Sequence, residues 1–91
     1  SSPGTVFQPF LESEMKSVGS RIKHMSVVNH AQGYIFKMTA HSRRANTEEH
    51  LYNLEKAQLH FEKALQSNPN NKYTLRNYAQ TLLLLEMQSQ D

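Results

Sequence analysis

The stretch AQLHFEKALQSNPN at residues 57–70 decides how this chain folds. It places two small residues, an aromatic residue and a proline at relative positions 0, +4, +7 and +12: Ala57, Phe61, Ala64 and Pro69. The first three share one face of a helix. The alanines allow a second helix to approach closely, and the phenylalanine fills the space between them. Because the proline cannot continue a helix, the stretch predicts a helix that stops just before it and packs against another one.

The helix that contains this stretch is expected at residues 47–67. Asn46 is followed three residues later by Glu49, which is close to a capping box. After the proline, the apolar spacing predicts a further helix at residues 71–87. Its apolar residues are Leu75, Tyr78, Ala79, Leu82, Leu83 and Met87.

Two more helices are expected before residue 47, at residues 9–25 and 26–41. Pro9 suits the first turn of one, and Ser26 is a candidate cap for the other. Their apolar stripes are Leu11, Met15, Val18, Ile22 and Met25, and then Val27, Val28, Ala31, Tyr34, Ile35 and Met38. Residues 1–8 are expected to be a flexible leader. The prediction is therefore one all-α domain of about four helices over residues 9–91.

The composition limits the classes of protein that this chain can belong to. Its 91 residues allow one small domain, and 37% hydrophobic with 20% charged residues excludes a disordered polar tail. The lack of cysteine excludes disulfides, cysteine zinc sites and a cysteine nucleophile, and it fits a reducing compartment. No apolar run approaches the roughly 20 residues that span a bilayer. We expect a soluble protein in the cytoplasm or on the cytosolic face of an organelle.

The motif at residues 57–69 resembles the tetratricopeptide repeat (TPR), whose second helix has the pattern A-x3-F-x2-A followed by a proline. The next helix carries the family's large, large, small and aromatic positions at Leu75, Tyr78, Ala79 and Leu82. NHAQ at residues 29–32 echoes NYAQ at residues 77–80, an offset of 48 residues. A plain repeat has about 34 residues. The resemblance therefore implies a right-handed stack of antiparallel helices with about one and a half repeats, the first of them lengthened.

This resemblance implies a function in protein–protein interaction, as an adaptor or scaffold. In the family, the first helices of successive repeats line a concave surface that holds an extended or helical peptide. In this register the surface consists of Met25, Val28, Gln32, Ile35, Tyr73, Arg76, Gln80 and Leu83. Its apolar lining suits an amphipathic helix or a short apolar motif of a protein partner. A complete clamp for acidic chaperone tails is not expected, because Val28 and Gln32 replace the Lys and Asn of the first repeat, although Asn77 matches.

The first half of the chain is basic, because no acidic residue lies between Glu14 and Glu48. Its cations are Lys16, Arg21, Lys23, Lys37, Arg43 and Arg44. One alternative function is therefore binding of nucleic acid or of an anionic membrane through this basic patch. A solvated helix face gives the same pattern, and no aromatic residues interleave with the cations as they do in a stacking platform.

A third hypothesis is self-association through Leu82–Leu85. These four leucines point in all directions round the last helix, which lacks the partner helix that a complete repeat would provide. The element would then serve to hold copies of the chain together.

Catalysis finds little support in the sequence. There is no glycine-rich phosphate loop and no nucleophile elbow. The five histidines show no i, i+4 pair and no neighbouring cysteine, so no metal site is expected. They are His24, His30, His41, His50 and His60. We therefore expect a protein that is not an enzyme and that needs no cofactor.

Overall fold

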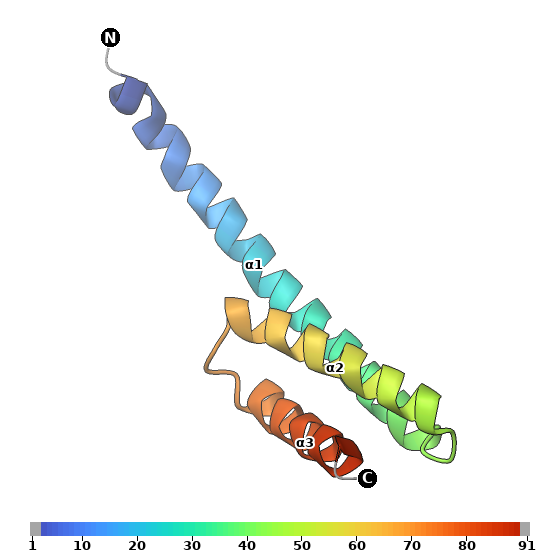
Figure 1. The fold of residues 1–91 in the computed structure, drawn as a ribbon. Coiled ribbons are helices and arrows are strands. Elements are labelled where there is room, and N and C mark those ends of the chain that lie inside the picture. The colour runs from blue at the N-terminus through green and yellow to red at the C-terminus, as the bar shows by residue number, and fades with distance from the viewer. Residues whose placement is uncertain (1–2, 90–91) are drawn as a thin grey trace.

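The computed structural model describes the backbone of residues 3–89 and the side chains of residues 13, 14 and 16–89. This part of the chain is all-helical and contains three helices and no strand. They are α1 (Pro3–Ser42), α2 (Thr47–Ser67) and α3 (Lys72–Ser89). Figure 1 shows α2 running back along the C-terminal half of α1, with α3 beside α2.

The first two expected helices form one continuous helix, so the predicted break between residues 25 and 26 is wrong. Ser26 does not cap a helix, because its hydroxyl donates a hydrogen bond to the carbonyl oxygen of Ala64 in α2 (3.0 Å). Gly19 has an ordinary negative φ and interrupts nothing. The helix begins at Pro3, which suits the first helical position, and Pro9 lies inside it. Residues 3–8 of the expected leader are therefore helical, and residues 1–2 lie outside the described part.

Asparagine caps define the starts of the other two helices. The Asn46 side chain accepts a hydrogen bond from the backbone N–H of Glu49 (3.2 Å), and α2 then has the bounds that the sequence pattern predicts, 47–67. Asn71 accepts from the N–H groups of Tyr73 and Thr74 at 3.0 and 3.2 Å. Because Asn71 is this cap, α3 begins one residue later than expected and ends at Ser89.

Small residues spaced seven apart bring α1 and α2 together. On α2 they are Ala57 and Ala64, both fully buried. On α1 they are Ser26, Gly33 and Ala40, all buried. The helices are antiparallel, since Ser26 bonds to Ala64 at one end while His50 donates from Nδ1 to the carbonyl oxygen of Ala40 (2.7 Å) at the other. Residues seven apart lie on one side of a helix, so two rows of small side chains face each other.

The ring of Phe61 packs directly on the backbone of α1. Phe61 has no exposed surface, as expected for the side chain between the two alanines. A Cβ atom at Gly33 would lie 2.7 Å from both Cδ1 and Cε1 of this ring, closer than van der Waals contact allows. The ring therefore occupies the space that any other residue at position 33 would need.

The register of α3 differs from the expected one. Its buried residues are Thr74 and Thr81, whereas Leu75, Ala79 and Leu82 are exposed. The threonines can be buried because their hydroxyls have partners: Thr81 donates to the carbonyl oxygen of Asn77 (2.8 Å), and Thr74 bonds to His30 Nδ1 (2.8 Å). Tyr78 is partly buried, and its hydroxyl donates to Glu62 of α2 (2.8 Å). Of the predicted repeat-packing positions of α3, Tyr78 is the one that is partly buried, and Leu75, Ala79 and Leu82 are exposed.

The large apolar residues of α1 lie on its exposed side. Val27, Val28, Ala31, Tyr34, Ile35 and Met38, expected to form a buried stripe, are all exposed. Burial follows size here, because the close approach of α2 accepts only small side chains on the side of α1 that it covers. The N-terminal half of α1 extends beyond α2 (Figure 1), which gives the molecule extents of 65 × 22 × 20 Å. No helix of the described chain combines the length and the apolar character that crossing a membrane requires.

Two glycine substitutions on α1, one at the contact with Phe61 and one away from it, test this packing. Gly33→Ala gains about 1 kcal/mol of helix propensity, but the clash with Phe61 outweighs it, and we expect a net loss of about 1–2 kcal/mol of unfolding free energy. Gly19→Ala meets nothing within 4 Å and is expected to raise the unfolding free energy by about 0.5–1 kcal/mol. Urea titrations of both variants measure the difference. Equal effects of the two substitutions would contradict the close contact.

Candidate functional site

A groove of about 470 Å³ lies between α1 and α3. Its lining is mostly apolar and aromatic: His30, Ala31, Tyr34, Ile35, Tyr73 and Asn77. Tyr73 is 77% exposed and Ile35 63% exposed, so large apolar side chains stand in water along its edges. Such side chains can bury their surface only against another molecule or another part of the chain.

Polar contacts at the bottom of this groove hold α3 against α1. Thr74 and His30 are joined by the hydrogen bond described above. One turn further on, the ammonium group of Lys37 donates to the side-chain oxygens of Asn77 (3.0 Å) and Gln80. Burial, and then the nearby positive charge of Arg76, lower the pKa of Lys37 below its ordinary value. The position of α3 on α1 thus depends on hydrogen bonds.

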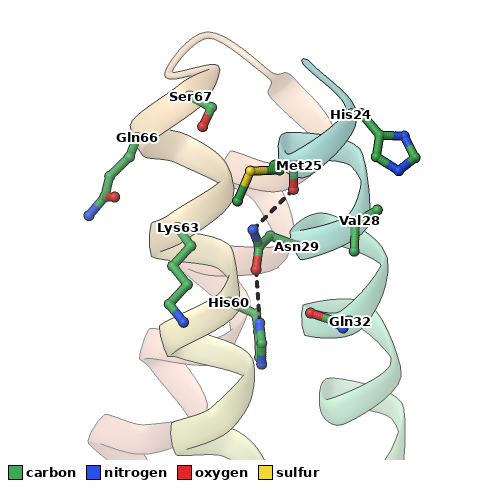
Figure 2. A pocket seen from close by; sticks show the side chains of 9 residues that line it. All are labelled: His24, Met25, Val28, Asn29, Gln32, His60, Lys63, Gln66 and Ser67. Carbon is green, nitrogen blue, oxygen red and sulfur yellow. Dashed lines mark hydrogen bonds between the residues drawn. The ribbon is translucent and has the colours of Figure 1, made fainter. Parts of the chain in front are cut away.

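A second groove of about 620 Å³ lies between α1 and α2 (Figure 2). It is lined by His24, Met25, Val28, Asn29, Gln32, His60, Lys63, Gln66 and Ser67. Figure 2 shows Asn29 between the two helices, where it donates to the carbonyl oxygen of Met25 (3.0 Å) and meets Nδ1 of His60 (3.0 Å). This groove is more polar than the α1/α3 groove, and its charged lining residue is a lysine.

His60 is the titratable group at the centre of the α1/α2 groove. Its ring stacks on Phe36 with the ring centres 5.4 Å apart and the planes 8° from parallel. Because Asn29 presents its side-chain oxygen, Nδ1 of His60 carries the proton and donates it. Burial, followed by the positive charges of Lys63 and Lys56, lowers the pKa of His60. The neutral ring is therefore the form that this structure favours.

The eight residues predicted to line one concave surface fall into three places. The α1/α2 groove contains Met25, Val28 and Gln32. The α1/α3 groove contains Ile35 and Tyr73. On α3, Gln80 bonds to Lys37, while Arg76 and Leu83 are exposed. The prediction of a single surface is corrected in this respect, because the four α1 residues span an arc of the helix that borders both grooves.

The predicted basic patch is not one surface. Lys16 and Lys37 are 21 residues apart in α1, which corresponds to about 32 Å along the helix. Lys37 is occupied by its two bonds to α3, and Arg43 lies 3.6 Å from Glu49. Arg21 and Lys23 remain exposed on α1. The six cations therefore do not form one surface, although Lys16, Arg21 and Lys23 are exposed on the same part of α1.

Several residues that organise the site escaped the sequence prediction. Gly33, Lys37 and His60 position the helices, and Thr74 and Thr81 replace the expected leucines in the α3 contact. The spacing of seven between small residues on α1 was a signal that could have identified Gly33. The polar contacts leave no comparable pattern, since they depend on which helices become neighbours.

No group of three histidine, aspartate or glutamate side chains in the described structure is arranged to hold a metal ion. His30 bonds to Thr74, His50 to the Ala40 backbone, and His60 to Asn29. Three of the five histidines therefore act in packing and hydrogen bonding between helices.

The pKa shift of His60 predicts a pH-dependent stability. Because the folded pKa lies below the ordinary value of about 6.5, the unfolded chain binds more protons between the two values. The contribution of His60 to the unfolding free energy is therefore fully present above about pH 6.5, and it is lost as the pH falls through the folded pKa. Urea titrations at about pH 7 and pH 5 measure this loss, and His60→Gln should show a smaller loss than the wild type. An identical loss in both proteins would contradict the role of His60.

The Lys37 contact predicts that a substitution can destabilise α3 without affecting the contact between α1 and α2. Lys37→Met removes both hydrogen bonds to α3, and we expect the amides of α3 to exchange about tenfold faster. The amides at the contact of α1 with α2 should keep their rates. Lys23→Met, at an exposed position of the same helix, is the matched control and should leave α3 unchanged. Hydrogen exchange read by mass spectrometry distinguishes these outcomes.

Comparison of this protein with protein-family models, with curated proteins and with solved structures finds no match. What the chain binds is therefore inferred from its own side chains. Those are apolar and aromatic in the α1/α3 groove, and mainly polar in the α1/α2 groove.

Proposed function

We propose that this chain is a TPR-like, non-enzymatic interaction module that binds a peptide or an amphipathic helix of a partner protein in the α1/α3 groove. The observation that carries the proposal is the exposure of Tyr34, Ile35 and Tyr73 round one concave surface. An adaptor or scaffold needs such a surface and stably folded helices that carry it.

The order and packing of the helices support the resemblance to the repeat family. Ala57, Phe61 and Ala64 are fully buried in a helix that packs antiparallel to its predecessor, and Pro69 lies in the connection to α3. In the family, the helices corresponding to α1 and α3 line the peptide-binding surface. The α1/α3 groove lies between these two helices.

The chemistry of the groove supports an apolar or amphipathic ligand. Burial of apolar surface contributes about 25 cal/mol per Å², and tyrosines are frequent among residues that dominate binding energy. Asn77 at the edge can also bond to a ligand backbone. A helix or an extended segment with two or three apolar side chains fits this combination.

The distribution of cations disfavours binding of a polyanion. A nucleic acid or anionic membrane needs several lysines and arginines on one surface. Here Lys37 and Arg43 have partners within the chain, and Lys16 is far from Lys37 along α1. We therefore place protein binding first, and we propose the cytoplasm or the cytosolic face of an organelle as the compartment because the chain has no cysteine.

Charge introduced into the groove should abolish binding. Tyr73→Glu places a carboxylate where an apolar ligand would lie, and we expect at least a tenfold weaker recovery of partners in quantitative pull-downs. Leu59→Glu is the matched control, since Leu59 is an exposed leucine of α2 that lines neither groove. Recovery of the same proteins at the same level by wild type and Tyr73→Glu would show that the groove is not the binding site.

The salt dependence of binding distinguishes an apolar protein ligand from a polyanion. Apolar binding should change little between about 0.1 and 0.5 M salt, whereas binding to a polyanion falls steeply over that range. Tyr73→Glu and Leu59→Glu should first be shown to unfold at the same urea concentration as the wild type. A loss of binding can then not result from a loss of folding.

A further inference from the structure

The N-terminal half of α1 exposes three large apolar side chains at and beyond the end of α2. Val18 is 50%, Ile22 42% and Met25 58% exposed. They recur at steps of four and three, so they form one stripe along the helix. Within the described chain, α2 ends at Ser67, close to the level of Ser26, so Val18 and Ile22 lie beyond it, while Met25 lies at its end and lines the α1/α2 groove.

This stripe continues the side of α1 that already binds a helix. Ile22 lies one turn before Ser26, which bonds to Ala64 of α2. Met25 lies one turn before Asn29, which bonds to His60 of α2. The surface that accepts α2 thus extends for two further turns, and it becomes more apolar where α2 ends.

A second helix could approach this stripe as closely as α2 approaches Gly33. Gly19 lies seven residues before Ser26, in line with Ser26, Gly33 and Ala40, and nothing lies within 4 Å of the position of its Cβ. The geometry therefore suits a helix that follows the line of α2 along α1.

The charges round the stripe define the occupant. Lys16, Arg21 and Lys23 are exposed on this part of α1, and Lys63 lies on the last turns of α2. The one described acidic residue on this part of α1 is Glu14, one turn before Val18, and none follows it before Glu48, so cations are in excess round the stripe. A second copy of the chain would bring the same cations together, at a cost in free energy. Acidic side chains on both edges of an apolar helix face would complement them.

We propose that Val18, Ile22 and Met25 form a docking surface for an acidic amphipathic helix of a partner protein. This surface is separate from the α1/α3 groove, so the two sites can bind different segments. The partner helix would lie along α1 beyond the C-terminal end of α2, with its apolar side chains on the stripe and its carboxylates near Arg21 and Lys23.

Designed helices provide the probe. A labelled peptide of three heptads, with leucine at the a and d positions and glutamate at the e and g positions, is titrated with the full chain, and fluorescence anisotropy reports binding. The matched peptide has lysine at e and g. We expect the glutamate peptide to bind at least tenfold more tightly than the lysine peptide.

Two neutral substitutions locate the site. Ile22→Gln should weaken binding of the glutamate peptide at least tenfold, because it removes the centre of the stripe while keeping a good helix former. Val27→Gln changes an exposed apolar residue outside this stripe and should keep wild-type affinity. Equal affinity of wild type and Ile22→Gln would overturn the proposal.

Charge reversal tests the edges of the surface. Arg21→Glu combined with Lys23→Glu should invert the preference, so that the lysine peptide becomes the tighter ligand. An unchanged preference would overturn the choice of an acidic partner. Sedimentation of the wild type as a dimer that Ile22→Gln dissociates would instead show that the occupant is a second copy. Tyr73→Glu should leave binding of the glutamate peptide intact, which separates this site from failure of the α1/α3 groove.

Discussion

The contact between the Phe61 ring and the backbone of Gly33 sets the distance between α1 and α2, and the other packing follows from that distance. The missing side chain at position 33 lets the ring lie flat against α1. At this distance the row on α1 consists of small side chains, Ser26 and Ala40 beside Gly33. On α2 the small Ala57 and Ala64 face it, and the larger Leu54 and Phe61 are fully buried with them. Hydrogen bonds from Ser26 and His50 then fix the antiparallel register at its two ends.

In the part of the chain that the structure describes, close packing of the small side of α1 leaves most of its large apolar side chains exposed, although Phe36 stacks on His60. In a helix pair packed through leucines, such residues would form the core, and the surface would be polar. Here the core is small, and Tyr34, Ile35 and Met38 remain exposed. α3 packs mainly against α2, and polar contacts join it to α1, of which the Lys37 bonds to Asn77 and Gln80 are the clearest. A small core with exposed apolar residues suits a protein that completes its packing by binding others.

Local features of the chain were predictable wherever one or two residues control the backbone. The cap at Asn46 and the stop before Pro69 are of this kind, because a side chain bonds to, or a ring removes, a backbone group within a few residues. Asn71 was instead expected as the first residue of its helix, whereas it caps α3. The burial of Ala57, Phe61 and Ala64 was predictable too, since a phenylalanine between two alanines on one helix face has few alternatives to a close helix contact. Of the residues predicted to line a binding surface, Ile35 and Tyr73 lie in the same groove, and their role in binding stays a prediction.

The residue pattern was thus enough to predict the helical class, the bounds of α2 and the close contact that α2 makes through its alanines. Contacts between the helices were needed to show that residues 9–41 form one helix, that α1 buries its small side, and that Thr74 and Thr81 face inward on α3. Periodicity shows which residues share a side of a helix, but each of these helices has two sides that could be buried. The choice between them depends on how near the neighbouring helix comes and which hydrogen-bond partners it offers, and both are properties of residues far away in the sequence.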